Sequence, residues 1–305
     1  MSAPSNPTIV YVHGIGNKRK PETLRREWDR ALFGREMGGA SRMAYWADLR
    51  YGEPLPDRAN DELPISETEL EAVGREETPA VVQSTEDFVE QTSEELVPEG
   101  DPAAESLRRL AREMAWRADA LAAGEEDREA RLGEEILPLP RGWRTWLFRQ
   151  VIQRFLADAH AYVSGGQGAS IRSRLEQALQ GLTGPVVVVG HSLGSVIAYD
   201  VLHEYQGALD VPLFVTVGSP LATREIQDVV AQPLQVPRPV TAWLNAADGR
   251  DLVAVDPTIR PEYAPVERCS DYLVVNDADP HHHGISGYLA ASPIQGAIRR
   301  LFGIV

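Results

Sequence analysis

Residues 186–202 constrain the fold of this chain more than any other part of the sequence. Four consecutive valines lead into GHSLG at residues 190–194, and a run of small and apolar residues follows. A short β-branched run predicts a buried strand, and the run after it favours a helix. Ser192 therefore lies where a strand turns into a helix, at a turn that leaves no room for Cβ atoms on either side.

The rest of the chain alternates between strand-like and helix-like segments. We expect strands in residues 8–14, 41–49, 186–189, 213–217, 240–244 and 272–275. We expect helices in residues 21–33, 101–123, 143–162, 171–182, 193–205 and 288–302. Strands that alternate with helices predict the α/β class, with a mostly parallel sheet and helices on both faces.

Acidic residues are concentrated in one internal segment. Residues 52–137 hold 25 of the 45 acidic residues but only 8 of the 30 basic ones, a local net charge of −17. This acidity excludes nucleic acid as the expected partner, because its phosphates would be repelled. We interpret residues 1–51 and 169–305 as one core and residues 52–168 as a helical insertion. Its acidic part is expected to be partly disordered.

Cysteine content and the N-terminal residues predict the compartment. Cys269 is the one cysteine, so no disulfide can form within the chain and a reducing environment is indicated. The first residues lack the basic and apolar regions of a signal peptide, and no apolar run is long enough to span a bilayer. We expect a cytoplasmic protein without a transmembrane segment.

The surroundings of Ser192 suit a nucleophile. A serine at a strained strand-to-helix turn projects its hydroxyl beyond the carboxyl ends of the strands. The helix behind it presents its positive N-terminal dipole and the Leu193 N–H to a developing oxyanion. The glycine-rich residues 12–16 (VHGIG) can bring a second backbone N–H close. They complete neither the dinucleotide-binding motif nor the phosphate-binding loop motif, and we expect no cofactor. The alternative is a tight turn that happens to contain serine.

These motifs together resemble those of the α/β-hydrolase family, in its lipase- and esterase-like branch. The resemblance rests on VHGIG at 12–16, GHSLGS at 190–195 and TVGSPLA at 216–222, followed by an acid and a histidine in the family's order. It covers residues 8–49 and 169–305 and leaves the acidic middle aside. It implies an α/β-hydrolase fold with Ser192 as nucleophile. The backbone N–H groups of Ile15 and Leu193 would form the oxyanion hole.

The family order also implies where the acid and the base should lie. The acid should follow TVGSPLA, where Asp251, in an Asp-Leu-Val turn, is preferred to Asp248. The base should precede the last helix, where His283 is preferred to His282 in a run of three histidines. That run also suggests a metal, but consecutive residues rarely converge on one ion and the i, i+4 spacing is missing, so we expect none.

The resemblance predicts a serine hydrolase that cleaves a small-molecule or lipid-like carboxylic ester through an acyl-enzyme. Other chemistries stay open, because one fold and one triad serve amide and peptide hydrolysis and acyl transfer as well. A non-catalytic module of the same fold, whose insertion recruits a protein partner, is a further alternative.

The insertion contains an apolar stripe that is open to several interpretations. A segment that leaves the strand ending near Leu49 emerges at the carboxyl edge of the sheet, which predicts a cap. The stripe could pack as core, line an acyl pocket, or meet a partner or a membrane surface. Its members are Trp143, Trp146, Leu147, Ile152, Phe155 and Leu156.

Overall fold

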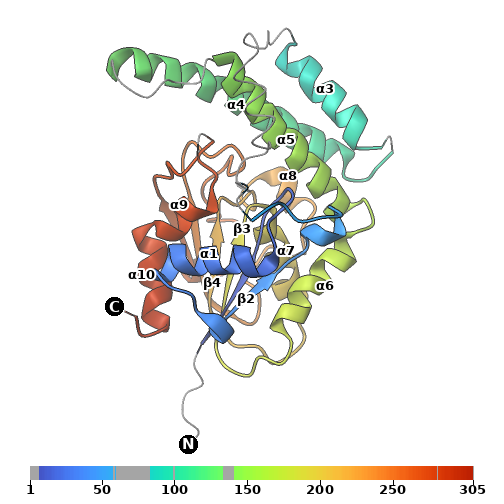
Figure 1. Cartoon of the computed structure of the whole chain (residues 1–305). Coiled ribbons are helices and arrows are strands. Elements are labelled where there is room, and N and C mark those ends of the chain that lie inside the picture. The colour runs from blue at the N-terminus through green and yellow to red at the C-terminus, as the bar shows by residue number, and fades with distance from the viewer. Residues whose placement is uncertain are drawn as a thin grey trace, which may run out of the picture.

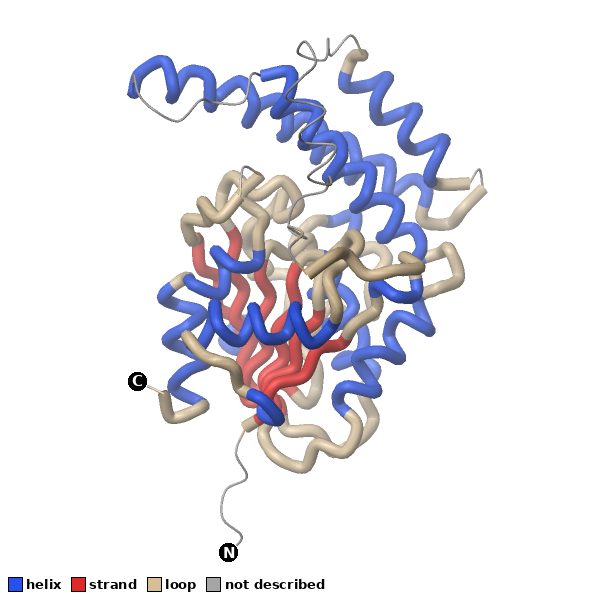
Figure 2. Tube along the Cα trace, in the orientation of Figure 1, coloured by secondary structure: helices blue, strands red, loops and turns tan. Residues whose placement is uncertain are grey.

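The computed structural model describes residues 7–57, 59, 83–98, 100–132, 141–279 and 281–304, and side chains outside 124–144. In these residues the strands form one sheet (Figure 2). It has six strands in the order β2-β1-β3-β4-β5-β6, and every neighbouring pair is parallel. The strands are β1 (Thr8–Val12), β2 (Ser41–Ala44), β3 (Val186–His191), β4 (Val211–Val217), β5 (Val240–Ala247) and β6 (Cys269–Leu273). The predicted α/β class with a parallel sheet is confirmed.

Helices cover both faces of the sheet, as the alternation of side chains along each strand requires. On one face, Tyr11 of β1 and Val187 of β3 pack in one core with helices α1, α9 and α10. On the other face, Val10 and Val188 pack in a second core with α6 and α7. These helices are α1 (Pro21–Phe33), α6 (Gly168–Leu179), α7 (Leu193–Glu204), α9 (Ile285–Ala290) and α10 (Ser292–Leu301); α8 (Arg224–Gln227) is a short helix after β4.

A further group of helices lies beyond the end of the sheet at which the strands finish (Figure 1). It consists of α3 (Thr85–Leu96), α4 (Ala104–Leu132) and α5 (Arg141–Val163). Helix α3 begins where Ser84 accepts a hydrogen bond from the Asp87 N–H at 3.1 Å, an N-cap pattern. The stretch predicted to be partly disordered falls largely on residues 58 and 60–82, which lie outside the described residues.

Several predicted elements differ from the observed ones. The strand expected over residues 41–49 ends at Ala44, and a short 3₁₀ helix follows at Ala47–Leu49. The single helix expected over residues 288–302 is two helices, because Pro293 cannot continue the hydrogen bonds of α9 and Ala291 is extended. The last strand was expected at residues 272–275 and is found at Cys269–Leu273. Its position is fixed by pairing with β5, from Trp243 opposite Cys269 onward, which local β-propensity does not encode. No described helix combines the length and apolar character needed to cross a membrane.

Candidate active site

The strand order creates a crevice between β1 and β3. The chain runs from β1 to β2 on one side and later returns to β3 on the other side of β1. In open parallel sheets, the carboxyl ends of strands at such a switch point diverge and leave room for a ligand. Ile15 follows β1, and Ser192 follows β3, so both lie at this edge.

The turn at Ser192 has the strained geometry expected from the sequence. Its φ is 55° and its ψ is −132°, values that are rare for a residue with a side chain. A Cβ on Gly190 would lie 2.6 Å from the Ser195 Cα, and one on Gly194 would lie 2.3 Å from the Val12 carbonyl oxygen. The two glycines are therefore required for the close packing of this turn.

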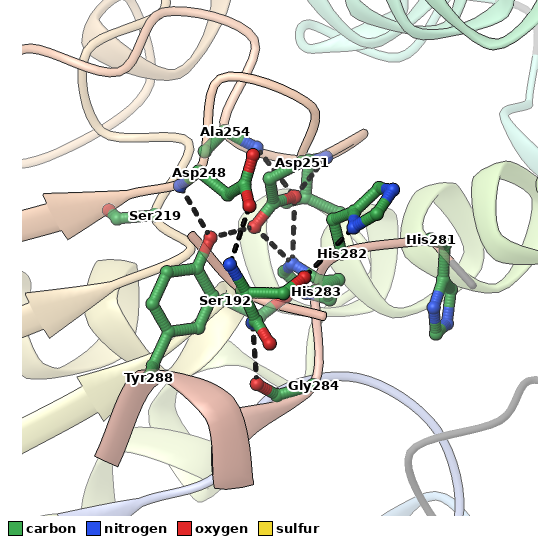
Figure 3. A network of polar contacts seen from close by, with 12 residues as sticks. Ser192, Ser219, Asp248, Asp251, Ala254, His281, His282, His283, Gly284 and Tyr288 are labelled. Atoms are coloured by element: carbon green, nitrogen blue, oxygen red, sulfur yellow. Dashed lines mark hydrogen bonds and ion pairs between the residues drawn. The ribbon is translucent and has the colours of Figure 1, made fainter. Parts of the chain in front are cut away.

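Two buried polar atoms at this edge have no hydrogen-bond partner in the described chain, the Ser192 Oγ and the His283 Nε2. Such a group costs about 1–3 kcal/mol relative to a hydrogen-bonded one. Figure 3 draws both side chains in the same cluster. These two unpartnered groups are explained if the Ser192 Oγ and the His283 Nε2 form hydrogen bonds to a ligand, or to each other, during a reaction.

The other nitrogen of the His283 ring is held by Asp251. The Nδ1–H donates to the two carboxylate oxygens at 2.9 and 2.8 Å (Figure 3). The fully buried carboxylate also accepts the N–H groups of Val253 at 2.8 Å and Ala254 at 3.2 Å, and the Tyr288 hydroxyl at 2.6 Å. These contacts fix the carboxylate, and with it the orientation and tautomer of the imidazole.

The same contacts determine the charge of Asp251. Burial alone would raise the pKa of this carboxyl, but the charge and hydrogen bond of His283, with hydrogen bonds from Tyr288 and Val253, lower it below its ordinary value. Burial and the nearby Asp251 raise the pKa of Tyr288 well above its ordinary value. Asp251 is therefore ionised at neutral pH and Tyr288 is a neutral donor.

Asp248, the alternative acid, has a different set of partners. Arg250 forms an ion pair with its carboxylate at 2.7 Å, and the Asn276 N–H donates to it at 2.6 Å. The Asp248 N–H donates to the Tyr288 hydroxyl at 3.0 Å. Asp248 therefore organises the loop after β5, and Asp251 holds His283.

The neighbouring histidines also point elsewhere. His282 has a φ of 57° and donates from Nδ1 to the Asn276 carbonyl oxygen at 2.8 Å. His281 pairs with Asp279, and Figure 3 shows its ring turned away from Asp251. Of the two predicted bases, the structure therefore brings His283 to the acid and not His282.

His191 and His13 shape the two loops, as their positions beside the motifs suggest. The His191 Nε2–H donates to the His283 carbonyl oxygen at 2.8 Å, and the two rings lie 4.6 Å apart. Burial, followed by the charge of His283, lowers the pKa of His191 well below its ordinary value, so it is neutral. The His13 Nδ1–H donates to the Gly14 carbonyl oxygen at 2.8 Å, and its Nε2 accepts the Trp46 N–H at 3.0 Å.

The loop after β1 packs directly on the serine. A Cβ on Gly14 would lie 2.6 Å from the Ser192 Cβ, so only glycine allows this approach. Ile15, the next residue, lines a pocket together with His283. The Leu193 N–H begins helix α7 and so has no acceptor within that helix. Of the two backbone groups predicted for the oxyanion hole, the Ile15 N–H thus lies on the loop that packs on Ser192, and the Leu193 N–H lies at the start of α7.

Helix α5 holds this loop through Asp158, a residue that the sequence analysis missed. The fully buried Asp158 carboxylate accepts the Gly16 N–H at 2.8 Å, across 142 residues of chain. It also accepts the Arg50 Nε–H at 3.0 Å and the Tyr51 hydroxyl at 3.0 Å. No local pattern marks such a distant contact.

The pocket that reaches His283 lies between helices α1 and α5 and the loops after β1 and β6. It is lined by Ile15, Gly16, Asn17, Lys18, Leu24, Trp28, Val151, Arg154, His191, His281, His283, Gly284 and Ile285. None of the six residues of the predicted apolar stripe is among the described lining residues. The described members of the stripe therefore do not line the pocket beside His283.

Most of that stripe is core instead. Ile152, Phe155 and Leu156 are at most 1% exposed and pack in the same core as Val10 and Val12 of β1. Leu147 is buried as well, Trp146 is half-buried, and the Trp143 side chain lies outside the described residues.

Comparisons of this chain with protein-family models, with curated proteins and with solved structures give no match. In the described residues, no group of three or more histidine, cysteine, aspartate or glutamate side chains is arranged to hold a metal ion.

Proposed function

We propose that this chain is a serine hydrolase of the α/β-hydrolase type that cleaves carboxylic esters. One observation carries the proposal: Asp251 holds one nitrogen of His283, while the other nitrogen and the Ser192 hydroxyl are buried without a partner at the same edge of the sheet. A serine, an oriented imidazole and a buried carboxylate are the components of nucleophilic acyl transfer.

In the proposed reaction, the Ser192 Oγ attacks the ester carbonyl carbon while its proton passes to the His283 Nε2. The N–H groups of Ile15 and Leu193 stabilise the oxyanion, and Asp251 stabilises the imidazolium. His283 then gives the proton to the leaving alkoxide, and the alcohol departs. Water attacks the acyl-enzyme with His283 as base, which releases the acid and restores Ser192.

Helices α3–α5 would serve as a cap in this proposal. They follow β2 in the chain and lie beyond the carboxyl ends of the strands (Figure 1). Val151 and Arg154 of α5 line the same pocket as His283, and Ser192 is fully buried and is not among the lining residues. Substrate would therefore enter beneath α5. Cys269 is buried and unpaired, in keeping with the proposed cytoplasmic location.

The proposal is tested by labelling with a fluorophosphonate and by hydrolysis of 4-nitrophenyl esters from acetate to palmitate. We expect the probe to modify Ser192, and Ser192→Ala to lose label and about 10³-fold or more of kcat without a change in melting temperature. Ser173→Ala, a serine on α6 that bonds only its own helix at the Ser170 carbonyl, is the matched control.

An unlabelled Ser192 in a folded protein that hydrolyses no ester would reject the enzyme and favour a non-catalytic module. Labelling with turnover of amides but not of esters would instead keep the triad and change the substrate class.

A further inference from the structure

The pocket beside His283 has basic side chains in its lining. Lys18 and Arg154 line it, and no carboxylate of the described chain does. The acidity of the chain is concentrated in residues 52–137, and no described residue of that segment lines the pocket. A pocket with this lining favours anionic ligands.

Arg154 has no acceptor in the described chain. The Arg154 side chain is partly exposed and forms no hydrogen bond or ion pair with any described residue. Its Nη1 lies 3.9 Å from the position that a Cβ would take on Gly16, next to the loop that carries Ile15. A guanidinium has five N–H donors in a planar arrangement that suits a carboxylate or a phosphate. A bound oxyanion would supply the missing acceptor.

The carboxylate closest in sequence does not supply it. Asp158 lies one turn along α5 from Arg154, but its oxygens are taken by the Gly16 N–H, by Arg50 and by the Tyr51 hydroxyl. Arg50 and Asp158 form the ion pair at this place, with an N–O distance of 3.0 Å. Arg154 thus adds an uncompensated positive charge to the pocket.

A second positive charge lies close by. Lys18 is buried, with 8% of its surface exposed, and lines the same pocket. Burial and the charge of His283 lower the pKa of His191, and the charge of Lys18 lowers it further. Leu24, Trp28, Val151 and Ile285 add apolar surface to the lining, and the buried Trp28 Nε1–H has no acceptor in the described chain.

We propose that Arg154 binds an anionic oxygen group, a carboxylate or a phosphate, that the substrate carries in addition to its scissile ester. The inference rests on the proposed function and names the substrate class: acid esters in which a short carbon chain separates the anion from the reacting carbonyl. The apolar walls would contact that chain, and Arg154 would fix its charged end while His283 and Ser192 act on the other.

The test compares two esters of the same shape that differ in charge, 4-nitrophenyl hydrogen adipate and 4-nitrophenyl methyl adipate. We expect wild-type kcat/KM to be at least about tenfold higher for the anionic ester, and Arg154→Gln to lower that ratio about tenfold, as loss of a charge-assisted hydrogen bond implies. Arg154→Lys should keep part of the preference. Arg108→Gln removes an exposed charge outside the pocket and should keep the full ratio.

Two results would overturn the proposal: a wild-type preference for the neutral ester, or an unchanged ratio in Arg154→Gln. Inhibition of ester hydrolysis by glutarate and by butyl phosphate distinguishes a carboxylate from a phosphate. The anion that Arg154 binds is the one that inhibits the wild type more strongly and does not inhibit Arg154→Gln.

Binding measured without turnover separates this inference from the proposed reaction. Calorimetry with glutarate and butyl phosphate on Ser192→Ala should show binding of at least one, and Ser192→Ala combined with Arg154→Gln should lose it. If neither anion binds Ser192→Ala, the anion site fails even where esters are hydrolysed. If an anion binds but the wild type hydrolyses no ester and takes up no fluorophosphonate, the proposed reaction fails and the anion site stands.

Discussion

At the scale of single residues, the separation of two aspartates matters most. Asp248 and Asp251 lie in one loop, and both are at most 2% exposed. Asp248 meets a guanidinium at 2.7 Å, whereas Asp251 meets the His283 imidazole at 2.8 Å. A carboxylate beside an imidazole sets its tautomer and stabilises its charged form, whereas one beside arginine is structural.

We therefore expect Asp251→Asn to lower kcat about 10⁴-fold, because the amide favours the wrong tautomer of His283. Asp248→Asn should reduce the melting temperature and leave most of kcat per folded molecule. In the same way, His283→Ala should be far more damaging than His281→Ala. Rates of ester hydrolysis and melting temperatures of the four variants check these rankings. The reverse ranking would assign the roles of acid and base to Asp248 and His281.

The Asp248 ion pair also predicts a pH dependence of stability. Burial would raise the pKa of Asp248, but the hydrogen bonds and charge of Arg250 and the Asn276 N–H lower it below its ordinary value. A depressed folded pKa contributes stability that is complete above the unfolded pKa of about 3.9 and is lost as the pH falls through the folded value. The difference in unfolding free energy between wild type and Asp248→Asn should narrow from pH 7 to pH 3. A constant difference would contradict the assignment.

At the scale of elements, helix α5 has two faces with different roles. Val151, Arg154 and Asp158 recur at helical spacing and point to the pocket and the loop after β1. Ile152 and Phe155 lie on the adjacent face and pack in the core. The helix thus joins the pocket beside His283 to the core.

We expect Asp158 to position the loop that carries Ile15. Asp158→Ala should lower kcat with little change in KM, because the Ile15 N–H would lose its fixed place relative to the oxyanion. Asp158→Asn keeps an acceptor for the Gly16 N–H and should recover part of the loss. Asp200→Asn is the control: this buried aspartate bonds the Tyr162 hydroxyl at 2.6 Å and should affect melting temperature only. Equal effects of Asp158→Ala and Asp200→Asn on kcat would assign both to stability.

At the scale of the whole molecule, the sheet separates two cores, and helices α3–α5 extend one of them beyond the carboxyl edge. The site lies where this extension meets the crevice between β1 and β3. The pocket beside His283 and the packing of helices α3–α5 thus depend on different residues of the same layer.

Two substitutions in α5 that shorten a side chain to alanine separate these roles. Phe155→Ala should destabilise the fold by about 3–5 kcal/mol, as for other buried aromatics, and lower activity on 4-nitrophenyl acetate and palmitate by the same factor. Val151→Ala removes pocket wall and should change the ratio of the two rates. Melting temperatures and kcat/KM values check both predictions. If Phe155→Ala alone changed the ratio of the rates on acetate and palmitate, the apolar stripe would contact the acyl chain of the substrate.

The sequence by itself determined what depends on neighbours in the chain. The valine run, the glycines around Ser192 and the helix after it form one local unit, and helix α1 runs over the predicted residues from Pro21 to Phe33. Periodicity and steric limits act over a few residues, so such elements can be predicted. The order of strand and helix was enough for the α/β class.

Tertiary structure alone decided which distant groups meet. The choice of Asp251 for His283 depends on a hydrogen bond across 32 residues, and the Tyr288 hydroxyl that completes it comes from 37 residues away. The contact of Asp158 with Gly16 and the open guanidinium of Arg154 have no local signature at all. Hydrogen bonds and charge pairs require atoms within a few ångströms in space, and only the packing of helices on the sheet brings those atoms together.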